Sequence, residues 1–144
     1  MAGLMAEALD LGREEANLAR LAGLLHDVGH GPFSHVSEQV LERRACREAA
    51  AGLEAEKLHE ALTARVISEY LCGVVPEEYG NALPILFTKK APATLVKNII
   101  SGPLDADKID YLLRDSYFAG VKYGVFDRDK VIESLRPVRI GSGR

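Results

Sequence analysis

Three of the chain's four histidines lie close together, in the sequence LLHDVGHGPFSH. His26 and Asp27 are adjacent and come at the end of a helical pattern. One imidazole and one carboxylate offered together suit a divalent cation, and the unpaired carbonyls of a helix C-terminus add partial negative charge. We therefore expect His26 and Asp27 to bind a metal. The alternative is a helix C-terminus with ordinary polar residues, and the clustering with His30 and His35 weakens that interpretation.

A second group of polar residues is DADKIDYLLRD, at positions 105–115. Four of its side chains fall on one side of a helix or on the adjoining stripe: Asp107, Lys108, Tyr111 and Asp115. Such a face offers a carboxylate for a metal, an ammonium group for a phosphate, a phenol and a second carboxylate. The alternative is a surface helix with ion pairs, such as Asp110–Arg114 at i, i+4.

A third feature is His59, which precedes Glu60 at an expected helix start. This pair can supply a general acid or a hydrogen bond to a phosphate, although a surface histidine near a helix N-terminus is the alternative. Glu38 follows His35 by three residues on one expected helix. It can fix the imidazole's orientation and raise its pKa, as a proton donor to a leaving oxygen requires.

Other catalytic motifs are missing from the sequence. There is no Gly-x-x-x-x-Gly-Lys loop, no His-Glu-x-x-His and no Gly-x-Ser-x-Gly. Several further polar residues are interpreted as solvated surface: Lys89, Lys90, Tyr117, Lys122 and Tyr123. The chemistry therefore depends on the histidine and aspartate groups.

The bulk composition excludes some classes of protein. The formal net charge is −3, from 18 basic and 21 acidic residues, so a dedicated nucleic-acid binder is not indicated. A nucleotide substrate remains compatible, because a metal and a few placed cations neutralise phosphates locally. Cys46 and Cys72 lie far apart and form no Cys-x-x-Cys pattern, which favours a reduced, cytoplasmic setting. No apolar run approaches the roughly 18 residues that span a membrane, and no signal peptide is evident.

The positioning elements are expected to be helices. The sequence predicts helices at 1–11, 33–47, 58–71, 76–86, 92–100, 105–118 and 127–135. A further helix, between the first two of these, has Glu14 and Glu15 in its first turn and ends near His26-Asp27. The expected apolar face of the 58–71 helix consists of Leu62, Val66, Ile67 and Leu71. Segment 48–57 can be helix or loop, and 74–75 and 138–140 are too short for a sheet. The sequence therefore predicts an all-α fold, as one domain over 1–144.

Both ends of the chain favour a piece of a longer protein, or a start codon assigned too late. The sequence opens directly inside an amphipathic helix and closes in Gly-Ser-Gly-Arg. We expect the apolar stripe of residues 1–11 to be poorly covered, so that the chain self-associates as a homo-oligomer.

These motifs, in this order, closely resemble the HD-domain deoxynucleoside triphosphate triphosphohydrolases, the sterile-alpha-motif-and-HD type and its bacterial and archaeal relatives. The likeness runs from about residue 18 to residue 126. It implies an all-helical HD fold and a divalent metal (manganese, magnesium, iron or zinc) bound by His26, Asp27, Asp107 and one more histidine. In the family that histidine lies on the preceding helix. Residues 1–11 contain none, so the resemblance places it before Met1.

The same resemblance implies roles for the other polar residues. It implies that three side chains together make up the catalytic proton donor: His35, Glu38 and His59. The closest relatives have aspartate where this chain has Glu38. It assigns four side chains to the substrate: His30 and Lys108 to the phosphates, and Tyr111 and Asp115 to the sugar.

The function implied is hydrolysis of a deoxynucleoside triphosphate to nucleoside and triphosphate. The metal would polarise the phosphorus and activate a water, and the His35 group would aid departure of the sugar oxygen. An HD phosphohydrolase for other nucleotides or phosphomonoesters is a neighbouring possibility. A catalytically silent, truncated domain that binds nucleotide or partner chains is a third, favoured by the lack of a histidine in residues 1–11.

Overall fold

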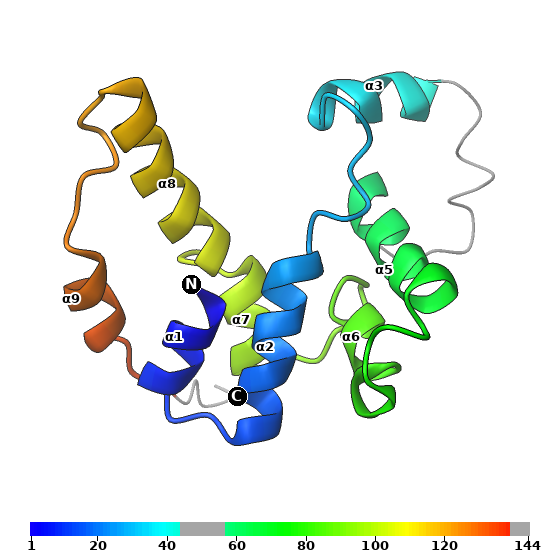
Figure 1. Cartoon of the computed structure of the whole chain (residues 1–144), viewed down its shortest axis with the longest axis horizontal. Helices are drawn as coiled ribbons and strands as arrows, with labels where there is room; N and C mark the ends of the chain where they lie inside the picture. The colour runs from blue at the N-terminus through cyan, green and yellow to red at the C-terminus, as the bar shows by residue number, and fades with distance from the viewer. Residues whose placement is uncertain (44–56, 139–144) are drawn as a thin grey trace, which may run out of the picture. The chain divides into compact units, whose positions relative to one another are not determined.

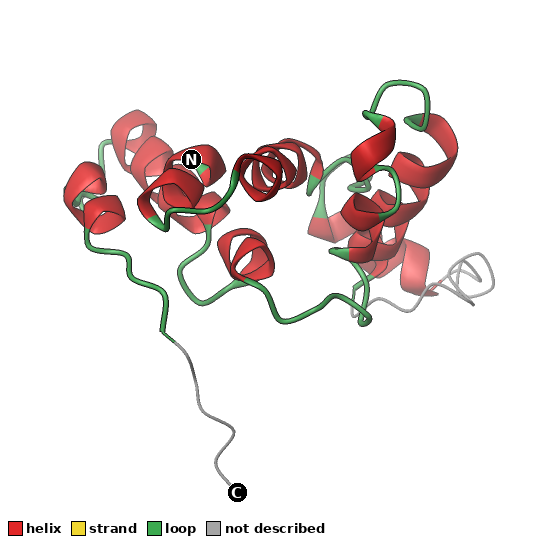
Figure 2. Cartoon of the chain, turned by 90° about the horizontal axis from the view of Figure 1, so that it is seen from below, coloured by secondary structure: helices red, strands yellow, loops and turns green. Residues whose placement is uncertain are grey.

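The structure is a computed structural model of the chain that describes residues 1–43 and 57–138. All the regular structure in these ranges is helical, and Figures 1 and 2 show no strand there. The helices are α1 Ala2–Ala8, α2 Arg13–Leu25, α3 His35–Arg43, α5 Leu58–Tyr70, η1 Glu77–Tyr79, α6 Ala82–Ile85, α7 Leu95–Ser101, α8 Ala106–Ala119 and α9 Arg128–Glu133. The predicted all-α fold is confirmed for the described residues.

Two predicted helices need correction. The third begins at His35 and not at Phe33, because Phe33 and Ser34 have positive φ angles of 67° and 50°, outside helical geometry. Its expected end at residue 47, and the ambiguous segment up to residue 56, lie outside the described residues. The predicted 76–86 helix is divided into η1 and α6, with the weak helix formers Gly80 and Asn81 between them.

The described residues form two compact units. The terminal unit is Met1–Gly23 with Thr94–Arg144, and the central unit is Leu24–Ala93. In the terminal unit, α1 packs against α7, α8 and α9. Its core contains Met5, Ile99, Ile100, Ile109 and Ile132, all buried. The apolar stripe of α1, which we expected to be poorly covered, is covered in part: Met5 is 2% exposed and Leu4 is 44% exposed.

In the central unit, α5 packs against α3 and α6. The core combines Ile67 with residues from η1, α6 and their flanks: Val75, Tyr79, Leu83, Leu86 and Phe87. The predicted apolar face of α5 is confirmed in part: Ile67 is fully buried, whereas Leu62, Val66 and Leu71 are half-buried. The buried side of α5 carries His59, Ala61, Thr63, Ala64 and Ile67. Backbone from the turn after α2 lies directly on this side of the helix, against Thr63 and the carbonyl of His59.

Three helices of the terminal unit begin with a side-chain cap. Thr94 accepts a hydrogen bond from the Lys97 amide at the start of α7. Asp105 does the same for α8 and Asp127 for α9, each from the amide three residues on. These caps fix the starts of α8 and α9 near the predicted positions 105 and 127. Among the described residues, no helix is both long and apolar enough to span a membrane.

Candidate active site

The turn that follows α2, residues 26–29, is called here the HD turn. It begins directly after Leu25, so His26 and Asp27 stand at the C-terminal end of α2 as the sequence predicts. Within the turn the Val28 amide donates to the Leu25 carbonyl at 3.1 Å. His26 Nε2 lies 3.4 Å from Asp27 Oδ2. That separation suits two ligand atoms on one cation, so the pair fits the metal that the sequence implies.

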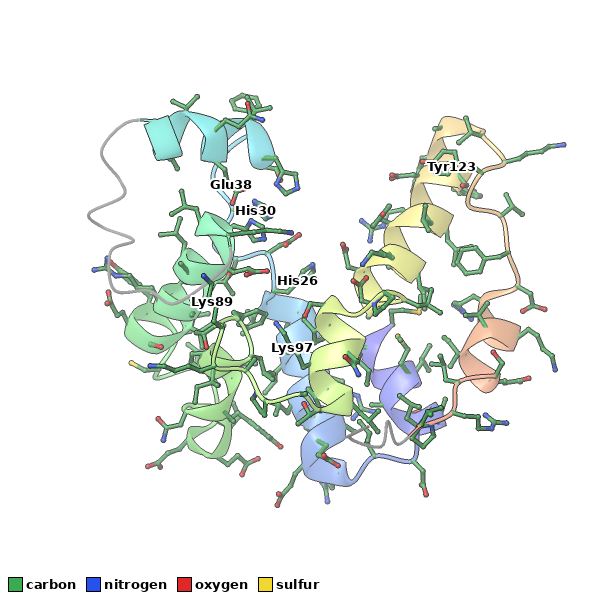
Figure 3. All side chains as sticks on the ribbon, turned by 180° about the vertical axis from the view of Figure 1, so that it is seen from behind. His26, His30, Glu38, Lys89, Lys97 and Tyr123 are labelled. Atoms are coloured by element: carbon green, nitrogen blue, oxygen red, sulfur yellow. The ribbon has the colours of Figure 1, made fainter. Side chains whose placement is uncertain are left out.

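His30 stands next to this pair. Its Nε2 is 3.5 Å from Asp27 Oδ1, and its Nδ1 is 3.4 Å from the hydroxyl of Ser34. Burial, and next the neighbouring His59 ring, lower the pKa of His30 below 6.5. The neutral imidazole is therefore favoured near neutral pH. Figure 3 labels His26, His30 and Glu38 within the central unit.

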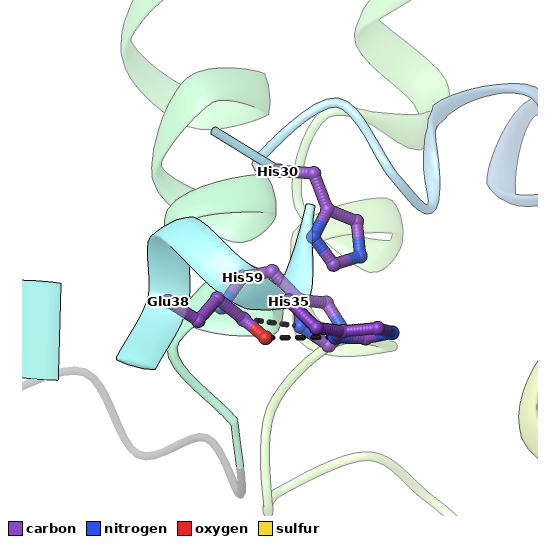
Figure 4. Close-up of side chains that lie close together, drawn as sticks. All are labelled: His30, His35, Glu38 and His59. Atoms are coloured by element: carbon purple, nitrogen blue, oxygen red, sulfur yellow. Dashed lines mark hydrogen bonds and ion pairs between the residues drawn. The ribbon is translucent and has the colours of Figure 1, made fainter. Parts of the chain in front are cut away.

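Glu38, on α3, joins two histidines from different elements. Its Oε2 accepts a hydrogen bond from His35 Nδ1 at 3.0 Å. Its Oε1 accepts two, from the His59 amide at 2.8 Å and from His59 Nδ1 at 2.5 Å. Figure 4 shows the carboxylate joined by dashed lines to both rings. Through these bonds α3 is connected to the first turn of α5.

The hydrogen bonds determine the charge of Glu38. Burial raises the pKa of the Glu38 carboxyl, but the hydrogen bonds from His35 and from the His59 amide and ring outweigh burial and lower it to about 2. The carboxylate is therefore ionised at neutral pH, and an ionised carboxylate accepts hydrogen bonds without donating any. Each Nδ1 of His35 and His59 must then carry the hydrogen of its bond to Glu38.

The three imidazoles are in direct contact. The rings of His30 and His59 stack with centroids 4.0 Å apart and planes inclined by 22°, and His35 meets His30 edge-on at 5.0 Å. One ligand atom from each of His30, His35, Glu38 and His59 lies within 4.8 Å of the others, so this cluster can also hold a metal ion. His35 is 71% exposed at its side chain and His59 only 10%. Solvent or a substrate therefore reaches His35 first.

The other predicted site residues belong to the terminal unit. Asp107 is half-buried, Tyr111 is 37% exposed and Asp115 is exposed. The Lys108 ammonium group donates to the Gly102 carbonyl at 3.0 Å and forms an ion pair with Asp105. Asp110 and Arg114 form the i, i+4 ion pair that the surface-helix alternative predicts.

The five residues interpreted as solvated surface are all exposed: Lys89, Lys90, Tyr117, Lys122 and Tyr123. Two buried polar residues near these groups escaped sequence reasoning. Asp105 is 5% exposed and caps α8. An aspartate just before a helical pattern is a recognised cap signal, so this residue could have been found. Thr63 is fully buried on α5 and hydrogen-bonds the HD turn, for which the sequence offers no signal.

Comparison with known proteins identifies the family. A family model described as HD domain matches residues 1–101. The chain belongs to the HD domain family. The all-helical fold and the position of the His-Asp pair agree with this membership, and a divalent metal is the cofactor of HD domains.

Individual relatives of this HD domain are longer proteins. An uncharacterised protein of Bacillus subtilis is 34% identical over 129 residues, which is 85% of this chain and 26% of the relative. A Dictyostelium discoideum homologue of a deoxynucleoside triphosphate triphosphohydrolase is 29% identical over 78% of the chain and 22% of its own length. The solved structure of a phosphohydrolase from Bacteroides thetaiotaomicron is similar with a TM-score of 0.67 and 29% identity, over 94% of this chain and 32% of that one. The chain thus spans about a fifth to a third of the length of these three proteins.

Proposed function

We propose that this HD domain is the hydrolytic part of a metal-dependent phosphohydrolase whose substrate is a deoxynucleoside triphosphate. The observation that carries the proposal is the Glu38 carboxylate, which orients both His35 and His59 beside the HD turn. The similarity to the solved structure of the Bacteroides thetaiotaomicron phosphohydrolase, with a TM-score of 0.67, supports phosphoester hydrolysis as the reaction class. The deoxynucleotide substrate rests on the resemblance of the motifs and on the similarity to the Dictyostelium homologue.

His26, Asp27 and Asp107 are the proposed metal ligands. Imidazole and carboxylate together accept manganese, magnesium, iron or zinc. When bound, the metal would act as a Lewis acid on the phosphate and lower the pKa of a water that attacks phosphorus. The 3.4 Å separation of His26 Nε2 and Asp27 Oδ2 supports the first two assignments, and the motif resemblance supports Asp107.

The His35 group supplies the proton for the leaving oxygen. His35 in its charged form carries hydrogens on both ring nitrogens, and Glu38 stabilises that charge through Nδ1. As the bond between phosphorus and the sugar oxygen breaks, Nε2 of His35 gives its proton to that oxygen and the ring becomes neutral. His59 is too buried for this role and serves to hold Glu38 in place. His30, Lys108, Tyr111 and Asp115 are the proposed contacts to phosphates and sugar.

The proposal is tested with the purified chain, manganese and a deoxynucleoside triphosphate, by measuring nucleoside and triphosphate in equal amounts. His35→Asn is expected to lower kcat by about 100-fold or more, the usual contribution of a general acid. Asp110→Asn, which removes a carboxylate charge from the exposed Asp110–Arg114 ion pair of α8, is expected to leave kcat unchanged. If the chain releases orthophosphate from a phosphomonoester and releases no triphosphate from the deoxynucleotide, the substrate assignment changes to a phosphomonoester. If the chain hydrolyses no nucleotide and no phosphomonoester, the result contradicts the proposal that the domain is an enzyme and favours a binding module.

A metal titration separates the two candidate metal positions. Asp107→Ala and Asp27→Asn are each expected to abolish high-affinity manganese binding, while Glu38→Gln retains it. Loss of binding in Glu38→Gln with retention in Asp27→Asn would place the ion in the His30, His35, Glu38 and His59 cluster and overturn the ligand assignment.

A further inference from the structure

The HD turn and α5 are connected through one buried hydroxyl. Thr63 lies one helical turn after His59 on α5, and its side chain is completely buried. Its Oγ1 donates to the His26 carbonyl at 2.9 Å and accepts from the Gly29 amide at 3.0 Å. A threonine hydroxyl has one hydrogen to donate. Thr63 donates this hydrogen to the carbonyl of His26, the first residue of the HD turn. Its oxygen accepts a hydrogen bond from the amide of Gly29, the last residue of the turn.

The backbone of the HD turn lies directly on α5 at this point. A Cβ added at Gly29 would come within 2.3 Å of the Thr63 amide nitrogen and 2.4 Å of the His59 carbonyl oxygen. Both are backbone atoms of α5, which cannot move aside as a flexible side chain does. The turn therefore rests on the same helical turn of α5 that carries His59.

This contact connects two functional groups. On one side, Thr63 holds the backbone of the proposed metal ligand His26 and closes the turn that presents Asp27. On the other side, the same helical turn begins with His59, whose amide and ring hold Glu38. Thr63 itself faces the backbone of the turn, so it acts on metal and substrate through other residues.

We propose that Thr63 is a positioning residue that fixes the His26-Asp27 pair in metal-binding geometry relative to the His35, Glu38 and His59 group. The role rests on the proposed function, because it presupposes a metal at His26 and Asp27. Outer residues that orient metal ligands through hydrogen bonds commonly change metal affinity by 10- to 100-fold when replaced.

The test is a manganese titration of the full chain, followed by electron paramagnetic resonance of the free ion, well below each variant's melting temperature. Thr63→Val keeps the shape of the side chain and removes both hydrogen bonds. It is expected to weaken manganese binding by about tenfold or more. Thr63→Ser restores the hydroxyl and is expected to bind within about threefold of the unchanged chain. Thr63→Ala replaces the valine variant if the latter does not fold.

Ile67→Val is the matched control. Ile67 is buried one turn further along α5, so its truncation lowers the melting temperature while the Thr63 hydrogen bonds to the HD turn are kept. Its manganese affinity is expected to equal that of the unchanged chain. A purely structural role of Thr63 would lower melting temperature and leave the affinity of the folded protein intact.

The outcomes are distinct. Unchanged affinity in Thr63→Val, or equal weakening in the valine, serine and Ile67 variants, overturns the positioning role and leaves the proposed function standing. Absence of manganese binding in the unchanged chain overturns the metal assignment of the proposed function, and the role of Thr63 falls with it. Weakening confined to the variants without a hydroxyl supports both.

Discussion

At the scale of single residues, Glu38 orients two histidines of the cluster. It accepts hydrogen bonds from two imidazoles and one amide and stays ionised, so Nδ1 of both His35 and His59 carries the hydrogen of its bond. The i, i+3 spacing predicted its bond to His35. Its bond to His59 comes from 21 residues away, and only the family resemblance grouped the two. Local spacing cannot reveal a contact that depends on how α3 packs on α5.

The Glu38 carboxylate is expected to make the stability of the chain depend on pH in the acid range. The pKa of Glu38 is about 2 in the folded chain against a usual 4.5, so the carboxylate favours the folded state above pH 4.5 and this contribution is lost as pH falls towards 2. At about 1.4 kcal/mol per unit, the contribution is roughly 3 kcal/mol. Glu38→Gln should therefore flatten the decline of the unfolding free energy between pH 4.5 and 2, measured by urea denaturation.

The control for this prediction is Glu69→Gln. Glu69 forms an exposed ion pair with Arg65, and exposed pairs contribute little to stability. Its replacement is expected to leave the pH dependence unchanged. An equal slope in the Glu38 variant and the unchanged chain would show that the carboxylate is not held by the histidines in solution.

At the scale of helices and turns, sequence periodicity located most elements but predicted the buried face of α5 only in part. Ile67 is fully buried, whereas Leu62, Val66 and Leu71 are half-buried. The fully buried positions also include Ala61, Thr63 and Ala64. At Thr63 the backbone of the HD turn lies directly against the helix. Hydrophobic periodicity does not predict the burial of Thr63, because threonine carries a polar hydroxyl. That hydroxyl is buried with hydrogen bonds to backbone atoms 34 and 37 residues away.

A glycine pair tests this close approach. Gly29→Ala should destabilise the chain by about 3 kcal/mol or more, because the new methyl group meets backbone atoms of α5. Gly73→Ala is the matched change, since a Cβ there meets nothing within 4 Å. Its effect should stay within about 1 kcal/mol. Thermal unfolding of both variants measures the difference, and similar melting temperatures would contradict the packing of the turn on α5.

Two capping aspartates give a prediction about α8. Asp105 is buried and accepts from both the amide and the ammonium group of Lys108, whereas the Asp127 cap of α9 bonds an amide at an exposed position. Asp105→Ala should therefore cost about 2 kcal/mol, and Asp127→Ala about 1 kcal/mol or less. Asp105→Asn should recover part of the loss by retaining an acceptor. Denaturant midpoints measure the order, and a larger effect at Asp127 would contradict it.

At the scale of the whole molecule, the family and the all-helical fold followed from the motifs and their order. The segments that carry the motifs belong to two compact units, so a helical pattern by itself could not bring Asp107 to the HD turn. That grouping came from the resemblance and is tested by the metal titration above.

The exposed apolar surface of the chain predicts self-association. The α1 stripe is partly buried, but large apolar side chains are exposed elsewhere on the terminal unit, within residues 117–125: Tyr117, Phe118, Val121, Tyr123 and Val125. We expect light scattering to give a mass above the monomer's 15.7 kDa. Replacing Tyr117 and Phe118 together by serine should lower that mass, while Tyr70→Ser, an equally exposed tyrosine of the central unit, should not. A monomeric mass for the unchanged chain would contradict the expectation.

The burial of Tyr79 in the central unit has a spectroscopic consequence. The chain has no tryptophan and five tyrosines, and of these Tyr79 is buried while Tyr70, Tyr111, Tyr117 and Tyr123 are exposed. A tyrosine ring held in a packed core gives near-ultraviolet circular dichroism that a freely rotating surface ring does not. The near-ultraviolet signal should therefore follow the melting of the central unit, while the far-ultraviolet helical signal follows both units. Unequal midpoints of the two signals would show directly that the unit carrying the His26-Asp27 pair unfolds on its own.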